Sequence, residues 1–123
     1  MADLSKKIFL AFPTRTPIGS FAGSLKKFTA ADLGVAAGQA VLQRSGIKPD
    51  LVDALIFGHA RQAGGGPNTA RQICYRLDIP EEREAFTVNQ ACNSGLKAIM
   101  LAAQSIALGE ASCVLAGGTE SMS

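Results

Sequence analysis

The chain has 123 residues, of which 47% are hydrophobic, 18% charged and 6% aromatic, and it contains no tryptophan. Its 12 basic and 10 acidic residues give a formal charge of +2 and are spread along the whole sequence. This length and composition predict one soluble α/β domain. Because no long run of like charges occurs, we expect neither nucleic-acid nor membrane-surface binding.

The N-terminus and the cysteines predict a reducing compartment. Met1 to Pro13 contains one short apolar run, which is neither a secretory signal nor long enough to span a bilayer, so we expect a cytoplasmic protein. The three cysteines have no C-x-x-C spacing, and the chain has a single histidine, His59. A metal site is therefore not expected.

In the first half of the chain, the pattern predicts a strand, a loop and a helix. The apolar run Ile8 to Phe12 predicts a buried strand inside a sheet. Pro13 to Lys27 is interpreted as a loop. Thr29 and Asp32 have the spacing of a capping box, and Gly46 ends the helix. The predicted apolar face of this helix consists of Leu33, Ala36, Ala37, Ala40 and Val41.

Further strands and helices alternate along the rest of the chain. Strands are predicted at 54–57, 86–88 and 113–116, and helices at 68–77 and from about Leu96 to Gly109. The predicted apolar face of the last helix consists of Leu96, Ile99, Met100, Ala103 and Ala107. The order βαβαβαβ predicts an α/β fold with a mostly parallel sheet and helices on both of its faces.

Cys92 lies between the third predicted strand and the start of the last predicted helix. Backbone N–H groups and the positive end of a helix both favour a thiolate, and the thiolate is the reactive form of cysteine. The same N–H groups can stabilise an oxyanion on an attacked thioester. Ser94 and Gly95 are small and allow close approach. Cys92 is therefore a candidate nucleophile.

Other motifs have structural interpretations. Cys74 falls in a helical pattern and Cys113 opens an apolar strand, so both are interpreted as small buried residues. Gly64, Gly65 and Gly66 lack the spacing of a phosphate-binding loop and are interpreted as a flexible turn. His59 ends an apolar run and is interpreted as a hydrogen-bonded structural residue.

Four blocks of the sequence together resemble the thiolase family, in its biosynthetic branch of acetyl-CoA acetyltransferases. The block Val88 to Ala98 is similar to the motif around the acyl-accepting cysteine, and Ala116 to Ser123 to the glycine-rich segment that follows it. Arg15 to Phe21 and Ala63 to Gln72 resemble two further loops of that family. The blocks occur in family order across essentially the whole chain, which is thus identified as the N-terminal part of a thiolase.

The resemblance implies a function and a set of residues. Cys92 would accept the acyl group in the reversible condensation of acyl-CoA thioesters, with its own N–H as an oxyanion donor. Residues near the active site or the subunit interface would be Asn89, Gly117, Gly118, Glu120, Ser121 and Met122. Coenzyme A thioesters would be substrates, with no tightly bound cofactor. Most residues that hold coenzyme A in the family come after the matching segment, so none is assigned here.

In the family, a histidine that activates the nucleophile and a second, acid/base cysteine come from the C-terminal half, and neither motif occurs in residues 1–123. We therefore expect an incomplete N-terminal domain, one sheet strand short, that is completed by a complementary chain within a homo- or hetero-oligomer. Three alternatives stay open: a non-catalytic assembly subunit, a free-standing acyl carrier, and a fragment of a β-ketoacyl-synthase-like condensing enzyme.

Overall fold

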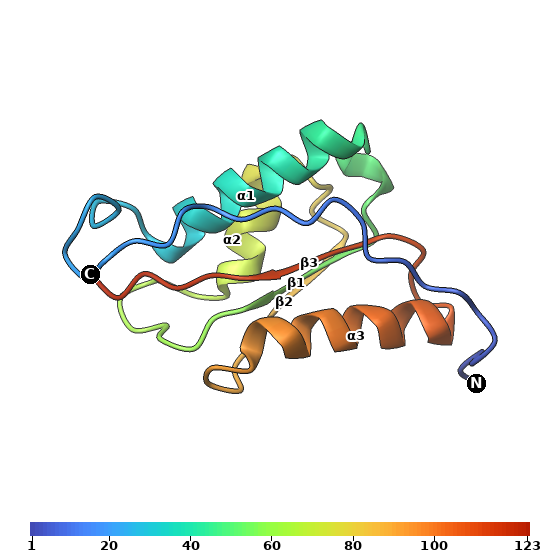
Figure 1. Ribbon diagram of the computed structural model, residues 1–123. Coiled ribbons are helices and arrows are strands. Elements are labelled where there is room, and N and C mark those ends of the chain that lie inside the picture. Colours follow the sequence, from blue (N-terminus) through green and yellow to red (C-terminus); the bar gives the residue numbers. More distant parts are fainter.

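The computed structural model describes residues 1–123 as a three-layered α/β fold (Figure 1). Its sheet has three parallel strands in the order β2-β1-β3. They are β1 (Ala54–Gly58), β2 (Glu84–Val88) and β3 (Val114–Gly118). Helices α1 (Ala30–Ser45) and α2 (Thr69–Arg76) cover one face, and α3 (Ser94–Leu108) covers the other. A short 3₁₀ helix, Pro49–Leu51, precedes β1. This confirms the α/β class and the parallel sheet predicted from the sequence.

The central strand β1 is buried along its whole length because helices cover both of its faces. Successive side chains of a strand point to opposite faces. Leu55 and Phe57 accordingly join the core beneath α1 and α2, whereas Ile56 packs against Ala98 and Ala102 of α3. The continuous apolar run at 54–57 therefore belongs to the strand that the two layers share.

Helix α1 begins and ends where its capping residues predict. The Thr29 hydroxyl accepts a hydrogen bond from the Asp32 N–H, and the Asp32 carboxylate accepts one from the Thr29 N–H. Gly46 ends the helix with a left-handed φ of 69°. The predicted apolar face was wrong, however. The buried positions are Ala30, Ala31, Gly34, Val35 and Gly38, while the predicted set is half-buried or exposed.

The apolar face predicted for α3 was also wrong, although its end at Gly109 was confirmed. The buried positions are Ser94, Ala98 and Ala102, whereas Leu96 and Met100 are 60% and 48% exposed. Both helices carry two neighbouring apolar stripes. In α3 the stripe of smaller residues faces the sheet, whereas in α1 it faces mainly α2, with Gly34 against Ile73 and Gly38 against Leu77. Small residues are buried at both contacts because they let the packed elements come closer.

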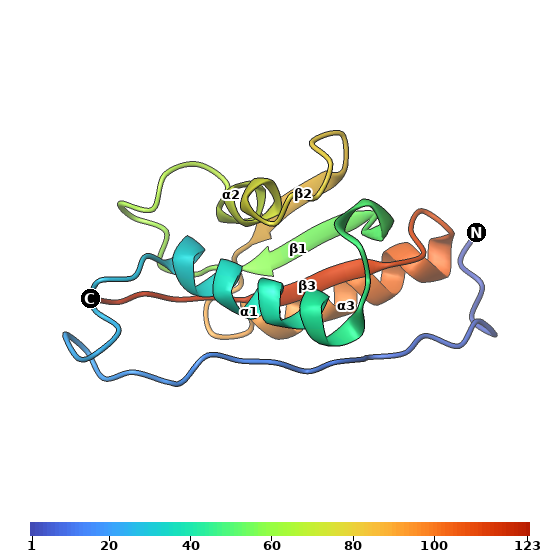
Figure 2. The same ribbon diagram turned by 90° about the horizontal axis from the view of Figure 1, so that it is seen from above.

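The predicted strand at Ile8 to Phe12 does not form in this structure. Residues 1–20 follow an extended path along the side of the molecule where β3 lies, as Figure 2 shows. Few hydrogen bonds hold this segment to the rest of the chain. The Asp3 N–H donates to Ala107 O, the Thr14 hydroxyl accepts from Arg44, and just beyond the segment the Ala22 N–H donates to the Ser123 hydroxyl. Phe9 and Leu10 are about 80% and 79% exposed. An apolar run predicts extended backbone, but pairing and burial also require a neighbouring strand, and no segment of residues 1–123 pairs with this run.

No helix of the structure has both the length and the apolar content needed to cross a membrane.

Candidate active site

Cys92 lies in the tight turn between β2 and α3, and its side chain is exposed. The Ser94 side chain closes this turn, since its hydroxyl accepts from the Gln90 N–H at 2.8 Å and donates to Ala91 O at 2.6 Å. Ala91 has a φ of 51°, a left-handed conformation that is uncommon for a residue with a Cβ. The turn therefore presents Cys92 at the N-terminus of α3, as the sequence predicts.

The backbone N–H of Cys92 makes no hydrogen bond within the chain, whereas the N–H groups of Asn93 and Ser94 bond to Gln90 O and Ala91 O. A free N–H beside the thiol can donate a hydrogen bond to an oxyanion, and the N-terminal end of α3 adds positive potential. The predicted role of the Cys92 N–H as a hydrogen-bond donor to an oxyanion stays a prediction.

An open pocket of about 590 Å³ contains Cys92. Its walls come from the carboxyl ends of all three strands: the loop after β1, the turn after β2 and the segment after β3. In parallel α/β sheets, ligands typically bind at this edge. The charged residues that line the pocket are Arg61 and Glu120, and Met122 also lines it. A small molecule can therefore reach the thiol.

Glycines from three separate segments, Gly58, Gly95 and Gly118, let the start of α3 lie directly on the strand ends. A Cβ on Gly58 would lie 2.4 to 2.6 Å from backbone atoms of Ser94 and Gly95, and one on Gly118 would lie 3.1 Å from the Gly95 Cα. A Cβ on Gly117 would meet the ring of Phe57 at 2.9 Å. Gly117 and Gly118 were predicted site residues, whereas Gly58 was missed. Its only sequence signal is a glycine at the end of an apolar run.

Asn89 and Glu120 both contact the loop after β1. Asn89 Nδ2 donates to Ala60 O at 3.1 Å, and Asn89 Oδ1 accepts from the Ala91 N–H at 3.1 Å. The Glu120 carboxylate accepts from the N–H groups of Ala60 and Arg61, both at 2.9 Å. The structure thus brings these two predicted residues to one loop beside Cys92.

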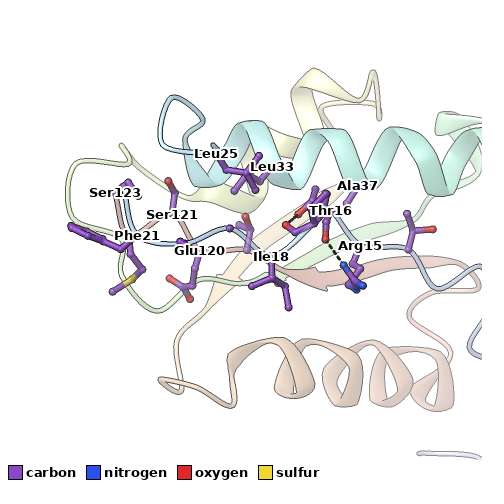
Figure 3. Close-up of a pocket in the computed structure, with 17 residues that line it drawn as sticks. Arg15, Thr16, Ile18, Phe21, Leu25, Leu33, Ala37, Glu120, Ser121 and Ser123 are labelled. Carbon is purple, nitrogen blue, oxygen red and sulfur yellow. Dashed lines mark hydrogen bonds between the residues drawn. The ribbon is translucent and has the colours of Figure 1, made fainter. Parts of the chain in front are cut away.

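Ser121 and Met122 lie next to a second cavity, of about 430 Å³, which Figure 3 shows. Its walls are the segment Thr14 to Phe21, Leu25 in the loop before α1, Leu33 and Ala37 of α1, and Gly118 to Ser123. The Ser121 hydroxyl donates to Phe28 O at 2.7 Å, and Met122 is 57% exposed. The predicted place of Glu120, Ser121 and Met122 at a subunit contact stays a prediction.

His59 is 2% exposed, and its Nδ1 lies 2.7 Å from the Thr69 hydroxyl. This confirms the interpretation of His59 as a buried, hydrogen-bonded residue. Its Nε2 makes no hydrogen bond and lies 3.7 Å from Glu120 Oε1. Sequence reasoning missed this proximity because the two residues are far apart along the chain.

The other two cysteines lie outside the pocket. Cys74 is buried, and burial raises the pKa of its thiol, partly offset by the nearby Arg71 guanidinium. Cys113 is half-buried, and burial together with the Asp53 carboxylate raises the pKa of its thiol. Both thiols are therefore poor nucleophiles near neutral pH. The structure gathers no group of three His, Cys, Asp or Glu side chains that could hold a metal ion.

Fold and site together define a class: a parallel α/β domain that presents an exposed cysteine at a helix N-terminus, at the carboxyl edge of its sheet. The model of the thiolase N-terminal domain matches residues 8–123, and the chain belongs to that family. It is 48% identical over its whole length to the cytosolic acetyl-CoA acetyltransferase of Gibberella zeae, covering 31% of that protein. It is 44% identical, over 97% of its length, to the acetyl-CoA acetyltransferase of Syntrophomonas wolfei, covering 30% of it.

Among solved structures, the human mitochondrial 3-ketoacyl-CoA thiolase in complex with CoA matches 89% of the chain, with a TM-score of 0.85 and 41% identity. The chain covers 28% of that structure. It therefore spans about a third of the length of these relatives.

Proposed function

We propose that this chain supplies the acyl-accepting nucleophile of an acetyl-CoA acetyltransferase, and that Cys92 carries the acyl group. The observation that carries the proposal is the exposed thiol of Cys92, in an open pocket, beside its own unbonded N–H at the start of α3. The family membership and the acetyl-CoA acetyltransferases among its relatives support the same reaction.

In the proposed first step, the Cys92 thiolate attacks the thioester carbonyl of an acyl-CoA. The carbonyl oxygen gains the negative charge and accepts a hydrogen bond from the Cys92 N–H. This hydrogen bond lowers the energy of the tetrahedral intermediate. The C–S bond to coenzyme A then breaks, the coenzyme A thiolate leaves, and the acyl group stays on Cys92 as a thioester. In the second step, the α-carbon of another acetyl-CoA attacks this thioester and releases Cys92.

The second step removes a proton from the α-carbon, and it needs an acid/base group that can reach the acyl-enzyme. His59 is buried and bonded to Thr69, and Cys74 and Cys113 lie outside the Cys92 pocket. We infer that a histidine and a second cysteine reach this pocket from the polypeptide that corresponds to the rest of the thiolase, within an oligomer. Coenzyme A thioesters act as substrates in this scheme, with no tightly bound cofactor.

Two features of the surface support such a companion polypeptide. Strand β3 pairs only with β1, so its other edge is open. The neighbouring N-terminal segment exposes Phe9, Leu10 and Ile18 to solvent. An open edge and exposed apolar groups favour association with further chain. Soluble, monomeric expression of residues 1–123 with a cooperative thermal transition and thiolase turnover would contradict this part of the proposal.

The reaction can be tested by turnover of acetoacetyl-CoA and coenzyme A in the protein assembled with the companion polypeptide. We expect turnover in the wild type, loss of at least about a thousandfold in Cys92→Ser, and nearly full turnover in the matched control Cys113→Ser. Turnover that survives in Cys92→Ser would refute the proposal. A folded assembly with no turnover and no acyl transfer would instead favour the non-catalytic assembly subunit.

A further inference from the structure

Polar contacts join all three loops around the Cys92 pocket in one continuous series. We propose that Glu120 and Asn89 are positioning residues that act as one hydrogen-bonded clamp, through the backbone of Ala60 and Arg61, on the turn that holds Cys92. The inference rests on the proposed function only in taking Cys92 as the nucleophile.

The first part of the clamp is the Glu120 carboxylate, which follows β3. Its Oε2 accepts from the Ala60 N–H and its Oε1 from the Arg61 N–H, each at 2.9 Å. Hydrogen bonds to an ionised acceptor are about twice as strong as neutral ones. The buried His59 ring lies 3.7 Å from Oε1 and is itself bonded to Thr69. Both carboxylate oxygens are thus engaged by the loop after β1.

The second part is Asn89, which follows β2. Its Nδ2 donates to Ala60 O, while its Oδ1 accepts from the Ala91 N–H. The contacts therefore run from Glu120 to the Ala60 backbone, from Ala60 to Asn89, and from Asn89 to Ala91. Ala91 directly precedes Cys92 and has the left-handed φ of 51°. Such a conformation costs free energy and persists only where surrounding contacts hold it.

Glu120 lines the same pocket as Cys92, and two explanations of its place there can be compared: its charge acts directly on the pocket, or its hydrogen bonds hold the loop after β1. A positioning role explains its presence because both oxygens are used to fix backbone N–H groups. The two explanations predict opposite signs for removal of the charge: a faster nucleophile if Glu120 acts only through its field, and a slower one if it acts through the clamp.

The clamp can be tested by hydrogen exchange at single-residue resolution in the assembled protein. In Glu120→Gln, the carboxamide keeps one acceptor oxygen, so one of the two loop N–H groups loses its partner. We expect the Ala91 N–H, which Glu120 does not contact, to exchange about tenfold faster. The matched control is Glu110→Gln, because the Glu110 side chain has no hydrogen bond or ion pair, and it should leave this rate unchanged. Faster exchange at Ala60 and Arg61 with no change at Ala91 would overturn the proposal.

Kinetics separate positioning from a purely structural role. We expect Glu120→Gln and Asn89→Ala each to lower kcat by about tenfold with KM within about twofold. The double variant should lose little more than either single one, because the residues act as one unit. Multiplicative losses, or a faster enzyme in Glu120→Gln, would contradict the clamp. Absence of acyl transfer in the wild type would refute the proposed function, and the exchange rates would still decide the clamp.

Discussion

On one face of the sheet, α1 and α2 bury a cluster of 11 residues, whereas on the other face α3 buries a cluster of three. The first cluster contains large side chains such as Leu55, Phe57 and Ile73. The second consists of Ile56, Ala98 and Ala102, and the start of α3 lies directly on the glycines at the strand ends. The difference indicates a division of roles: the α1 and α2 face supplies most of the stability, and the α3 face holds the Cys92 turn close to the sheet.

The largest expected effect is on the α1 and α2 face. Ile73 is fully buried, so Ile73→Ala should lower the free energy of unfolding by about 3 to 4 kcal/mol. The matched variant on the other face is Ile99→Ala, which truncates a half-buried side chain of α3 and should cost about 1 kcal/mol. Urea titration of the assembled protein measures both. Equal losses in the free energy of unfolding of the two variants would contradict the proposed division of roles.

The next effect is expected where α3 meets the strand ends. Gly58→Ala places a Cβ against backbone atoms that cannot rotate away, so it should cost about 2 to 3 kcal/mol and displace the Cys92 turn. Gly95→Ala is the control, since its Cβ would have a single ordinary contact, at 3.8 Å. This control should change the free energy of unfolding by less than about 1 kcal/mol. A neutral Gly58→Ala would show that the close approach is unimportant.

A smaller effect is expected at the start of β3, away from the site. Hydrogen bonds from the N–H groups of Ser112 and Cys113 hold the pKa of Asp53 below its usual value. A lowered pKa in the folded state means that this stabilisation is present above pH about 4. It is lost as the pH falls further through the folded-state pKa. Asp53→Asn keeps a neutral acceptor, so it should cost about 1 kcal/mol at pH 7.

In Asp53→Asn, the free energy of unfolding should also fall less steeply as the pH drops below 4. Urea titrations at a series of pH values in that range measure this. An undiminished acid dependence in Asp53→Asn would contradict the assignment of these hydrogen bonds.

The last comparison concerns the rates at which iodoacetamide alkylates the three thiols. Cys92 is exposed, whereas burial raises the pKa of the Cys74 and Cys113 thiols and lowers their thiolate fraction at pH 7 to 8. We expect Cys92 to react at least about tenfold faster than the other two, with Cys74 slowest. Peptide mass spectrometry over time gives the three rates. Equal rates in the assembled protein would contradict the comparison.

Local signals in the sequence predicted much of the fold. Thr29 with Asp32, Gly46 and Gly109 mark helix ends through contacts within a few residues, and these ends were confirmed. The position of Cys92 before α3 follows from the same local reading. The predicted helix faces were wrong because two apolar stripes lie side by side on each helix. The choice between them depends on how closely each stripe lets α3 approach the sheet and α1 approach α2.

Contacts between distant residues could not be predicted. The strand expected at Ile8 to Phe12 needs a neighbouring strand, which local sequence does not specify. Gly58 meets Gly95, and Glu120 meets the Ala60 and Arg61 backbone, across large separations along the chain. Only the folded sheet edge brings these groups together. The position of Cys92 at the start of α3 was therefore predictable, whereas the contacts around its turn were not.

The central claim is that Cys92 takes up the acyl group, and acid-quenched intact-mass measurement tests it most directly. The assembled protein is mixed with acetyl-CoA alone and quenched within one turnover. We expect this chain to gain the mass of one acetyl group, mapped to the peptide that contains Cys92, and to gain none in Cys92→Ser. An acetyl group on Cys74 or Cys113, or no acetyl group on this chain while the assembly turns over, would contradict the account.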